Sequence, residues 1–599
     1  MRTKYNVLPP VYELEDYITC IDKNYLYCKS TARLLRNNGS TNNTVWELIK
    51  ESMIDENSYD RSLIHRAICV PKKESSDTFI KTSIDERLKG YGLHSNVDET
   101  TCMAKGLEIS FYDVVFLVFF IVYITFISYA TYYDMYQRNM VGSNNNNRVN
   151  ASSENRIIKS FSLLSNWKKL TKVNAGEDFQ KLKSIQGIRF LCMVLIIGLH
   201  TSVSYAVVYI SNPEGVAEFA GHPVMQYVSV ASLFFVQPFF LISSWIVTFQ
   251  IYDFYNKHGK FTVKDAFIIV VNRYFRLVAC LVLLIILTRS NWIKIFDGPM
   301  LFENSYTTQK ACKQNWLQTL TFANNFLYFK DICIPTSWYM SVDFQLYVAA
   351  VVTVYLILRF NLNESKVLSF MFLFSCGFYG IYLYLTGMEV FYRTNANLIR
   401  GHSILHSYSL KVYYYATYPN WGTSLMGVSL GLFYIKNKHR TVPNNWVVTS
   451  VWLLLFFGLP SAAIFIAKSR LRGIPAAVLG PLIKPLFSLG VGIGILGMSY
   501  NIGGIVKRVF ENRFSVLMSN FSFSVYVFQF LVVFSKGAGA YSLMEYSMRN
   551  MVLSFIFFDL PMSITVGIIC TLIFEQPAIN LQKIFVPQLP SKQPHARKD

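Results

Sequence analysis

The stretch Lys181–Ser202, KLKSIQGIRFLCMVLIIGLHTS, decides the fold, because it passes from charged and polar residues into an apolar run typical of a membrane helix. Arg189 and His200 are eleven positions apart in this run. At about 100° and 1.5 Å per residue they share one helix face and lie about 16 Å apart along it. We expect Arg189 near the membrane surface and His200 about half-way through the hydrocarbon. An ionisable group at that depth usually lines a cavity, so His200 is a candidate site residue; the alternative is a histidine that bonds a neighbouring carbonyl.

The composition indicates a polytopic membrane protein. Of 599 residues, 52% are hydrophobic, 16% aromatic and only 15% charged, and the apolar residues are clustered. The net charge of +20 could point to nucleic acid. We exclude nucleic acid as a partner, because lysine and arginine are scattered over short loops between apolar stretches, as the membrane orientation rule requires.

The apolar stretches predict an all-α bundle of ten to eleven membrane helices, preceded by a small cysteine-containing domain outside the membrane. We predict spans at 109–133, 187–210, 225–251, 266–289, 338–358, 367–386, 421–436, 446–467, 480–499, 515–536 and 551–575. The expected organisation is a lumenal or extracellular domain at 1–108, a first helix at 109–133, a basic, Asn-rich and disordered cytosolic linker at 134–182, a membrane domain at 183–580 and a cytosolic tail at 581–599. The basic triplet Lys468, Arg470 and Arg472 falls on the lumenal side of this scheme, against the rule that favours cytosolic basic residues.

Six cysteines lie in polar segments and predict up to three disulfides on the lumenal side: Cys20, Cys28, Cys69, Cys102, Cys312 and Cys333. We expect Cys312 to pair with Cys333, because both lie in one loop. Asn38 and Asn42 begin glycosylation sequons that fit the same placement. No secretory signal opens the chain, so either its true start lies upstream or the first membrane helix carries the N-terminal domain across.

Three motifs resemble the acyltransferase-3 family of membrane O-acyltransferases, and in particular its animal branch, the nose-resistant-to-fluoxetine proteins. These are the Gly-x-Arg start with its Arg-x10-His spacing, the Trp-Ser-x-x-x-acid pattern in Pro335–Tyr347, PTSWYMSVDFQLY, and the basic stretch Asn272–Leu277, NRYFRL. The stretch Tyr12–Cys28 resembles part of that branch's N-terminal domain. The resemblance covers about 183–580.

The resemblance implies a role for each of these residues. His200 would be the catalytic base, and Asp343 would orient or charge-balance it or help to hold the acceptor. Arg189 would steer the acyl donor or fix the helix at the membrane surface. Arg273 and Arg276, expected at the cytosolic surface, would bind the phosphates of an acyl-coenzyme A co-substrate, or else anchor lipid headgroups. The remaining predicted substrate-binding residues are Trp338, Tyr339, Ser341 and Gln345. The structural alternative for Asp343 is a buried carboxylate that ties helices together.

Three positions depart from the family pattern, and each loses a charged or titratable group. Gln237 replaces an acid, Asn420 an arginine and Gln529 a histidine. The expected function is acyl transfer to a hydroxyl of a lipid, sugar or small molecule, with no bound cofactor and no metal. The alternative is a catalytically weakened member that binds or transports a lipid or small molecule. The expected location is the endoplasmic reticulum or the plasma membrane.

Overall fold

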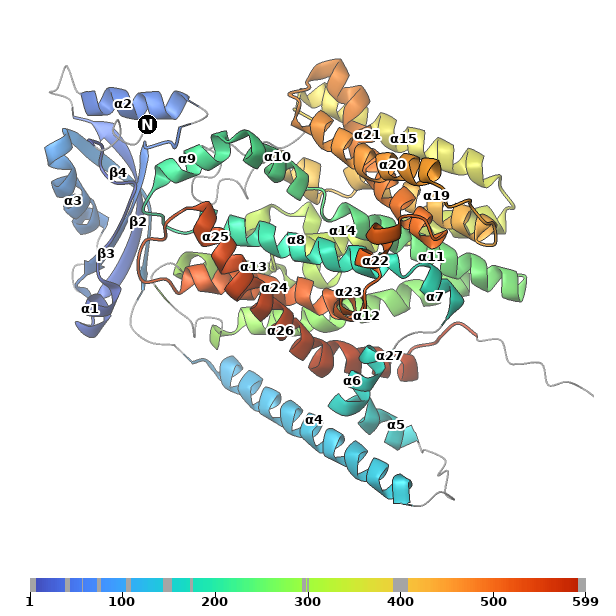
Figure 1. The fold of residues 1–599 in the computed structure, drawn as a ribbon. Helices are drawn as coiled ribbons and strands as arrows, with labels where there is room; N and C mark the ends of the chain where they lie inside the picture. Colours follow the sequence, from blue (N-terminus) through green and yellow to red (C-terminus); the bar gives the residue numbers. More distant parts are fainter. Residues whose placement is uncertain are drawn as a thin grey trace, which may run out of the picture.

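The computed structural model describes residues 7–37, 44–55, 58–72, 77–103, 109–143, 153–172, 176–292, 298, 301–390 and 408–590. The predicted sequons at Asn38 and Asn42 lie outside these residues. Figure 1 shows a small α/β domain beside a long bundle of helices. The bundle confirms the predicted all-α membrane architecture.

The N-terminal domain is a four-stranded sheet in the order β1-β3-β2-β4, with β1 parallel to β3 and the other neighbours antiparallel. Its elements are β1 (Tyr12–Leu14), α1 (Tyr17–Asp22), β2 (Leu26–Arg36), α2 (Thr44–Ile54), β3 (Leu63–Val70), α3 (Asp77–Leu88), η2 (Lys89–Tyr91) and β4 (Leu93–Met103). Helix α3 buries Ile80, Ile84 and Leu88, which recur every four residues and therefore form one apolar face. This face packs with Ile49 of α2 and the strands into one core.

All six cysteines of the polar segments form disulfides, as predicted. Cys312 pairs with Cys333, and the N-terminal domain holds Cys20 to Cys69 and Cys28 to Cys102. The two N-terminal pairings could not be read from the sequence. Each joins two neighbouring parts of the sheet region, so the small domain is cross-linked twice.

The helical part begins with α4 and continues to the end of the described chain. Its elements are α4 (Phe111–Ser143), α5 (Ser153–Ser160), α6 (Leu163–Thr171), α7 (Glu177–Lys181), α8 (Ser184–Ala206), α9 (Pro213–Gly221), α10 (Pro223–Ser232), α11 (Gln237–His258), α12 (Val263–Arg289), α13 (Leu301–Leu320), η4 (Asn324–Phe326), η5 (Phe329–Asp331), α14 (Ser337–Arg359), α15 (Glu364–Thr386), α18 (Tyr408–Leu410), η6 (Lys411–Tyr415), η7 (Tyr418–Asn420), α19 (Trp421–Asn437), α20 (Trp446–Lys468), α21 (Gly473–Ser499), α22 (Gly504–Phe510), α23 (Arg513–Ser519), α24 (Ser522–Ala538), α25 (Met548–Ser554), η8 (Phe555–Asp559), α26 (Leu560–Cys570), η9 (Thr571–Glu575) and α27 (Gln576–Phe585).

Nine helices among the described residues are long and apolar enough to cross a membrane, and the bent pair α23 and α24 makes a tenth. Each coincides with a predicted span. The one predicted span that remains, 421–436, corresponds to α19, which has 17 residues and is therefore short for a crossing. The last span joins α25, η8, α26, η9 and α27 into one run, in which η8 and η9 are π-helical.

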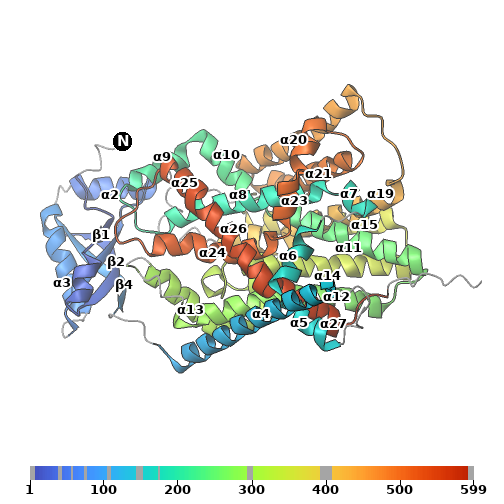
Figure 2. The ribbon, with the colours of Figure 1, turned by 60° about the horizontal axis from the view of Figure 1, so that its bottom comes forward.

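The N-terminal domain packs against one end of the bundle, which we call the domain side; the opposite end is the far side. Tyr12 stacks on Tyr209, just beyond α8, with ring centroids 4.8 Å apart, and the Lys29 ammonium lies 4.6 Å from the same ring. Arg61 forms an ion pair with Glu214 of α9. Figures 1 and 2 both show the sheet beside α9 and α25 at this end.

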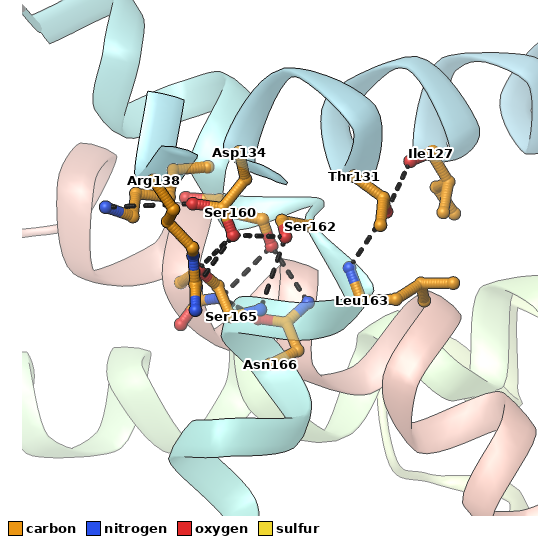
Figure 3. Close-up of polar contacts among 11 residues, drawn as sticks. Ile127, Thr131, Asp134, Arg138, Ser160, Ser162, Leu163, Ser165 and Asn166 are labelled. Carbon is orange, nitrogen blue, oxygen red and sulfur yellow. Dashed lines mark hydrogen bonds and ion pairs between the residues drawn. The ribbon is translucent and has the colours of Figure 1, made fainter. Parts of the chain in front are cut away.

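The segment predicted as a disordered linker contains the helices α5, α6 and α7, so that prediction is wrong for its described part. Figure 3 shows why α6 is held in place: Asp134 of α4 accepts hydrogen bonds from Ser162 at 2.7 Å and from Arg138 and Ser165 at 2.8 Å. Asn166 donates to the carbonyl of Ser160 at 3.1 Å. The polar composition that indicated disorder instead serves this network, which attaches the far-side end of α4 to the bundle.

The basic triplet after α20 lies at the domain side, as the span count requires. Arg472 forms an ion pair with Glu389, which follows α15, at 2.6 Å. Lys468 lies 3.6 Å from the ring centroid of Tyr227 in α10. These partners account for two of the three charges that oppose the orientation rule.

Candidate functional site

Helix α8 carries both ends of the candidate site. It begins at Ser184 on the far side, so Arg189 lies about 8 Å along its axis and His200 about 24 Å along it. His200 is six residues from the last residue of α8, Ala206. The histidine is therefore nearer the domain side than the half-way depth that the sequence indicated, because the helix starts earlier and ends earlier than predicted.

Gln529 of α24 is the hydrogen-bond partner of His200. The amide nitrogen of Gln529 lies 2.8 Å from Nδ1 of the half-buried His200. The ring of Phe530 meets the imidazole edge-on, with centroids 6.5 Å apart. Among the residues that the structure describes, His200 makes no other hydrogen bond and no ion pair.

Asp343 pairs with Arg273 rather than with His200. The carboxylate accepts a hydrogen bond from Nη2 of Arg273, whose guanidinium also donates to Ser243 at 3.1 Å and lies 4.7 Å from the ring centroid of Tyr347. The expected contact between His200 and Asp343 is therefore absent from the described residues. Each of the two is committed to a nearer partner on a different helix. Whether Asp343 takes part in catalysis stays a prediction.

Two more arginines, Arg189 and Arg276, lie near the ion pair of Arg273 and Asp343. Arg189 is close enough to Arg273, Arg276 and Asp343 to interact with them electrostatically, and Arg276 interacts likewise with the buried carboxylate of Glu575. We call these three arginines and two carboxylates the arginine cluster. Three cations face two anions, so the cluster carries an excess positive charge, which favours an anionic ligand.

Arg273 and Arg276 lie well inside helix α12 rather than at its end. Helix α12 begins at Val263, so Arg273 is about 15 Å and Arg276 about 20 Å from its start. Helix α12 begins three residues before the predicted span at 266, and the placement of the two arginines at the cytosolic surface stays a prediction. Nε of Arg273 and Oδ1 of Asp343 are both buried and have no hydrogen-bond partner in the described part of the chain. Hydrogen bonds within the described chain therefore use neither atom.

Tyr339 and Trp338 belong to an aromatic wall at the start of α14. Tyr339 packs against Phe240 and Tyr526, with centroids 5.2 and 4.8 Å away. Trp338 packs against Tyr414 at 4.5 Å. Tyr526 lies one helical turn before Gln529 on α24, so the wall extends to the neighbourhood of His200.

Ser341 and Gln345 of α14 bind the segment Phe322–Asn325, which precedes this helix in the chain. Ser341 donates to the side chain of Asn324, while Gln345 donates to the carbonyl of Phe322 at 2.7 Å and to Asn325 at 3.0 Å. Their polar atoms are used within the protein. Their predicted role as substrate-binding residues stays untested, and these contacts give them a structural one.

Two of the three departures from the family pattern contact each other. Gln237 of α11 donates to Asn420 at 2.9 Å and accepts from Thr423 at 2.9 Å. Asn420 also accepts from the ammonium of Lys484, which is 2% exposed and makes no ion pair within the described residues. An acid and an arginine would form an ion pair at these two positions; here two amides form a neutral pair. The sequence did not single out Lys484, because a lone lysine in an apolar run also fits a helix end.

A second buried ion pair lies beside α8. Asp559, the last residue of η8, accepts from Lys536 at 3.0 Å, from Ser554 at 2.9 Å and from Thr201 at 2.8 Å. Thr201 follows His200 directly, so this cluster fixes the part of α8 that carries the histidine. The sequence analysis missed it; the acid at position 559 inside an apolar run was the available signal.

A family model described as an acyltransferase domain matches residues 182–574, about two thirds of the chain. No curated protein and no solved structure is significantly similar to the chain. Among the described residues, no group of histidine, cysteine, aspartate and glutamate side chains could hold a metal ion. The matched region holds His200, the three arginines and Asp343 of the arginine cluster, and most of the membrane-spanning helices, and the chain belongs to the acyltransferase-3 family of multi-pass membrane proteins.

Proposed function

We propose that this protein is an O-acyltransferase that moves an acyl group from acyl-coenzyme A to a hydroxyl of a lipid, a sugar or a small molecule. The observation that carries the proposal is the position of His200 on the same face of α8 as Arg189, about 16 Å further along the helix. A donor with an anionic head and a thioester at the end of a long arm fits this spacing. The nose-resistant-to-fluoxetine branch and a location in the endoplasmic reticulum or plasma membrane belong to the same proposal.

The arginine cluster would bind the phosphates of the donor. Guanidinium groups present paired N–H donors that match phosphate oxygens, and a site with little water strengthens such bonds. The free Nε of Arg273 and the excess of one positive charge support this role.

His200 would act as the general base. Its imidazole accepts the proton of the acceptor hydroxyl while the oxygen attacks the thioester carbonyl. When the tetrahedral intermediate collapses, the C–S bond breaks and the imidazolium returns the proton to the coenzyme A thiolate. No charged group bonds His200 in the described chain, so no carboxylate stabilises the imidazolium and the imidazole would be neutral before the reaction.

A second candidate function is binding or transport of a hydrophobic molecule. A cavity of about 510 Å³ lies between α14, α15 and the residues that follow position 408. Its lining is mainly apolar and aromatic, with Leu346, Tyr382, Tyr418 and Trp421, and it also includes Lys411. A pocket of this size and lining suits an amphipathic ligand.

The test is acyl transfer by the purified protein in nanodiscs, with labelled acetyl-coenzyme A and extracts of lipids and sugars. We expect transfer by the wild type and none by His200→Ala, because the variant lacks the base. The matched control is His222→Ala, which removes an exposed histidine side chain that makes no capping hydrogen bond. Transfer that survives in His200→Ala excludes the base role, and label that binds without transfer in either protein favours the second function.

A further inference from the structure

The contact between Gln529 and His200 determines which ring nitrogen carries the proton, and its importance for turnover rests on the proposed base role of His200. In the structure, the Gln529 amide N–H donates to Nδ1 of His200 over 2.8 Å. A nitrogen that accepts a hydrogen bond carries no proton, so the neutral imidazole then has its proton on Nε2. This orientation of the amide leaves Oε1 of Gln529 buried without a partner among the described residues.

This arrangement cannot serve a general base. The lone pair of Nδ1 already accepts from the amide, and Nε2 carries a proton, so neither nitrogen can take one from an acceptor hydroxyl. After proton transfer the imidazolium would carry N–H at both nitrogens. Its Nδ1–H would then face the N–H of Gln529, donor against donor.

The opposite orientation of the amide removes both conflicts. Rotation of the amide by about 180° exchanges its oxygen and nitrogen, which are nearly the same size and are told apart by their hydrogen bonds. Oε1 would then accept from Nδ1–H in the neutral imidazole and equally in the imidazolium. The rotation also gives the buried oxygen the partner that it lacks.

We propose that Gln529 is a positioning residue that presents Oε1 to Nδ1 of His200 during turnover and so leaves the lone pair on Nε2 for the acceptor hydroxyl. The acceptor proton moves to Nε2 as the new C–O bond forms. The C–S bond then breaks, and the same proton moves from Nε2 to the thiolate. Nδ1 keeps its proton throughout, and Gln529 orients the ring without a charge of its own.

Two buried carboxylates that could have bonded the imidazole, Asp559 and Asp343, are already engaged elsewhere. Asp559 is bonded to Lys536 and to Thr201, which directly succeeds His200 in the chain, while Asp343 is bonded to Arg273. Among the described residues, neither carboxylate contacts the imidazole. The amide of Gln529 is therefore the group that fixes the tautomer.

The variants that test this role are Gln529→Glu and Gln529→Leu, with Gln226→Leu as the matched control. Glutamate offers oxygens alone toward Nδ1, so it keeps the required acceptor. Leucine removes the acceptor at a similar volume. Gln226 donates to the carbonyl of Ala220 at 3.1 Å and does not contact His200.

Two readouts are needed, and the first does not depend on activity. Nitrogen-15 NMR of the histidine-labelled protein in nanodiscs, with His200→Ala used to assign the signals, should show a protonated Nδ1 and an unprotonated Nε2 once a non-hydrolysable acyl-coenzyme A analogue is added. The second readout is the pH dependence of kcat and KM. We expect Gln529→Leu to lower kcat by about 10- to 100-fold at a similar KM, as for other groups that orient a functional histidine.

Gln529→Glu should keep kcat within about tenfold of the wild type and move the acidic limb of the pH profile to higher pH, because a carboxylate stabilises the imidazolium. Gln226→Leu should match the wild type. The inference is overturned if NMR finds the proton on Nε2 with the analogue bound, or if Gln529→Leu retains the wild-type kcat and pH profile. If the wild type transfers no acyl group, the proposed function fails, while the NMR spectrum still decides the tautomer.

Discussion

Asp343→Asn should destabilise the protein, because it removes one of the two carboxylates that face the three arginines. The Asp343 side chain is 4% exposed and that of Arg273 is 22% exposed. Removing one member of a buried ion pair costs about 3–5 kcal/mol. Arg273 is partly exposed and keeps its hydrogen bond to Ser243 and its contact with Tyr347, so we expect the lower end, about 3 kcal/mol.

The assay is denaturant unfolding in detergent micelles, followed by tryptophan fluorescence, for the single variants Asp343→Asn and Arg273→Gln and for the double variant. If the two residues mainly balance each other's charge, the double variant should regain most of the stability that either single variant loses. The reasoning is refuted if Asp343→Asn unfolds like the wild type and loses only acyl transfer. That result would place the carboxylate in the chemistry rather than in the charge balance.

Two further predictions concern groups outside this cluster. Asn420→Leu should lower the free energy of unfolding by about 1–3 kcal/mol, because it leaves donors of the buried Lys484 and Gln237 without their acceptor. Lys484→Met in the same background should restore part of that loss, and equal stability of wild type and Asn420→Leu would contradict this reasoning. Burial raises the pKa of Glu511, between α22 and α23, above its usual value of 4.5 despite the nearby Lys507. The folded state thus binds this proton more tightly than the unfolded state, and stability falls as pH rises from about 4.5 through the folded pKa. Glu511→Gln should therefore be more stable than the wild type at neutral pH and lose that advantage below about pH 4.5, whereas a constant difference across pH would refute the assignment.

The membrane helices could be predicted from sequence because a span needs about 20 apolar residues, whatever it packs against. The polar partners could not. The hypothesis that His200 and Asp343 meet came from the role that the family resemblance implies for Asp343, but the rotation and neighbours of each helix give them Gln529 and Arg273 instead. Sequence shows which residues are costly to bury and not which helix supplies the compensation.

The departures at positions 237 and 420 illustrate the same limit. Read singly, each loses a charged group and indicates weakened catalysis. In the structure Gln237 and Asn420 bond each other, so the pair keeps one contact between helices without charge. Among the disulfides, the pair Cys312 and Cys333 could be predicted because both residues share a loop. The pairing in the N-terminal domain could not be predicted, because it depends on the strand order of the sheet.

The two π-helical turns of the last span impose a requirement on its length. Asp559 ends η8 and Glu575 ends η9, and both carboxylates bond residues of α24, namely Lys536 and Ser524. Sixteen residues of uninterrupted α-helix would place them about 160° apart, on nearly opposite faces. Of the two π-helical turns, η9 lies between these acids, and its wider turn changes the angular register so that both face the same neighbour. A π turn holds one residue more than an α turn, so deleting a single residue from Thr571–Glu575 would let η9 close as α-helix with Glu575 still facing Ser524, whereas inserting one residue would rotate Glu575 by about 100° away from it.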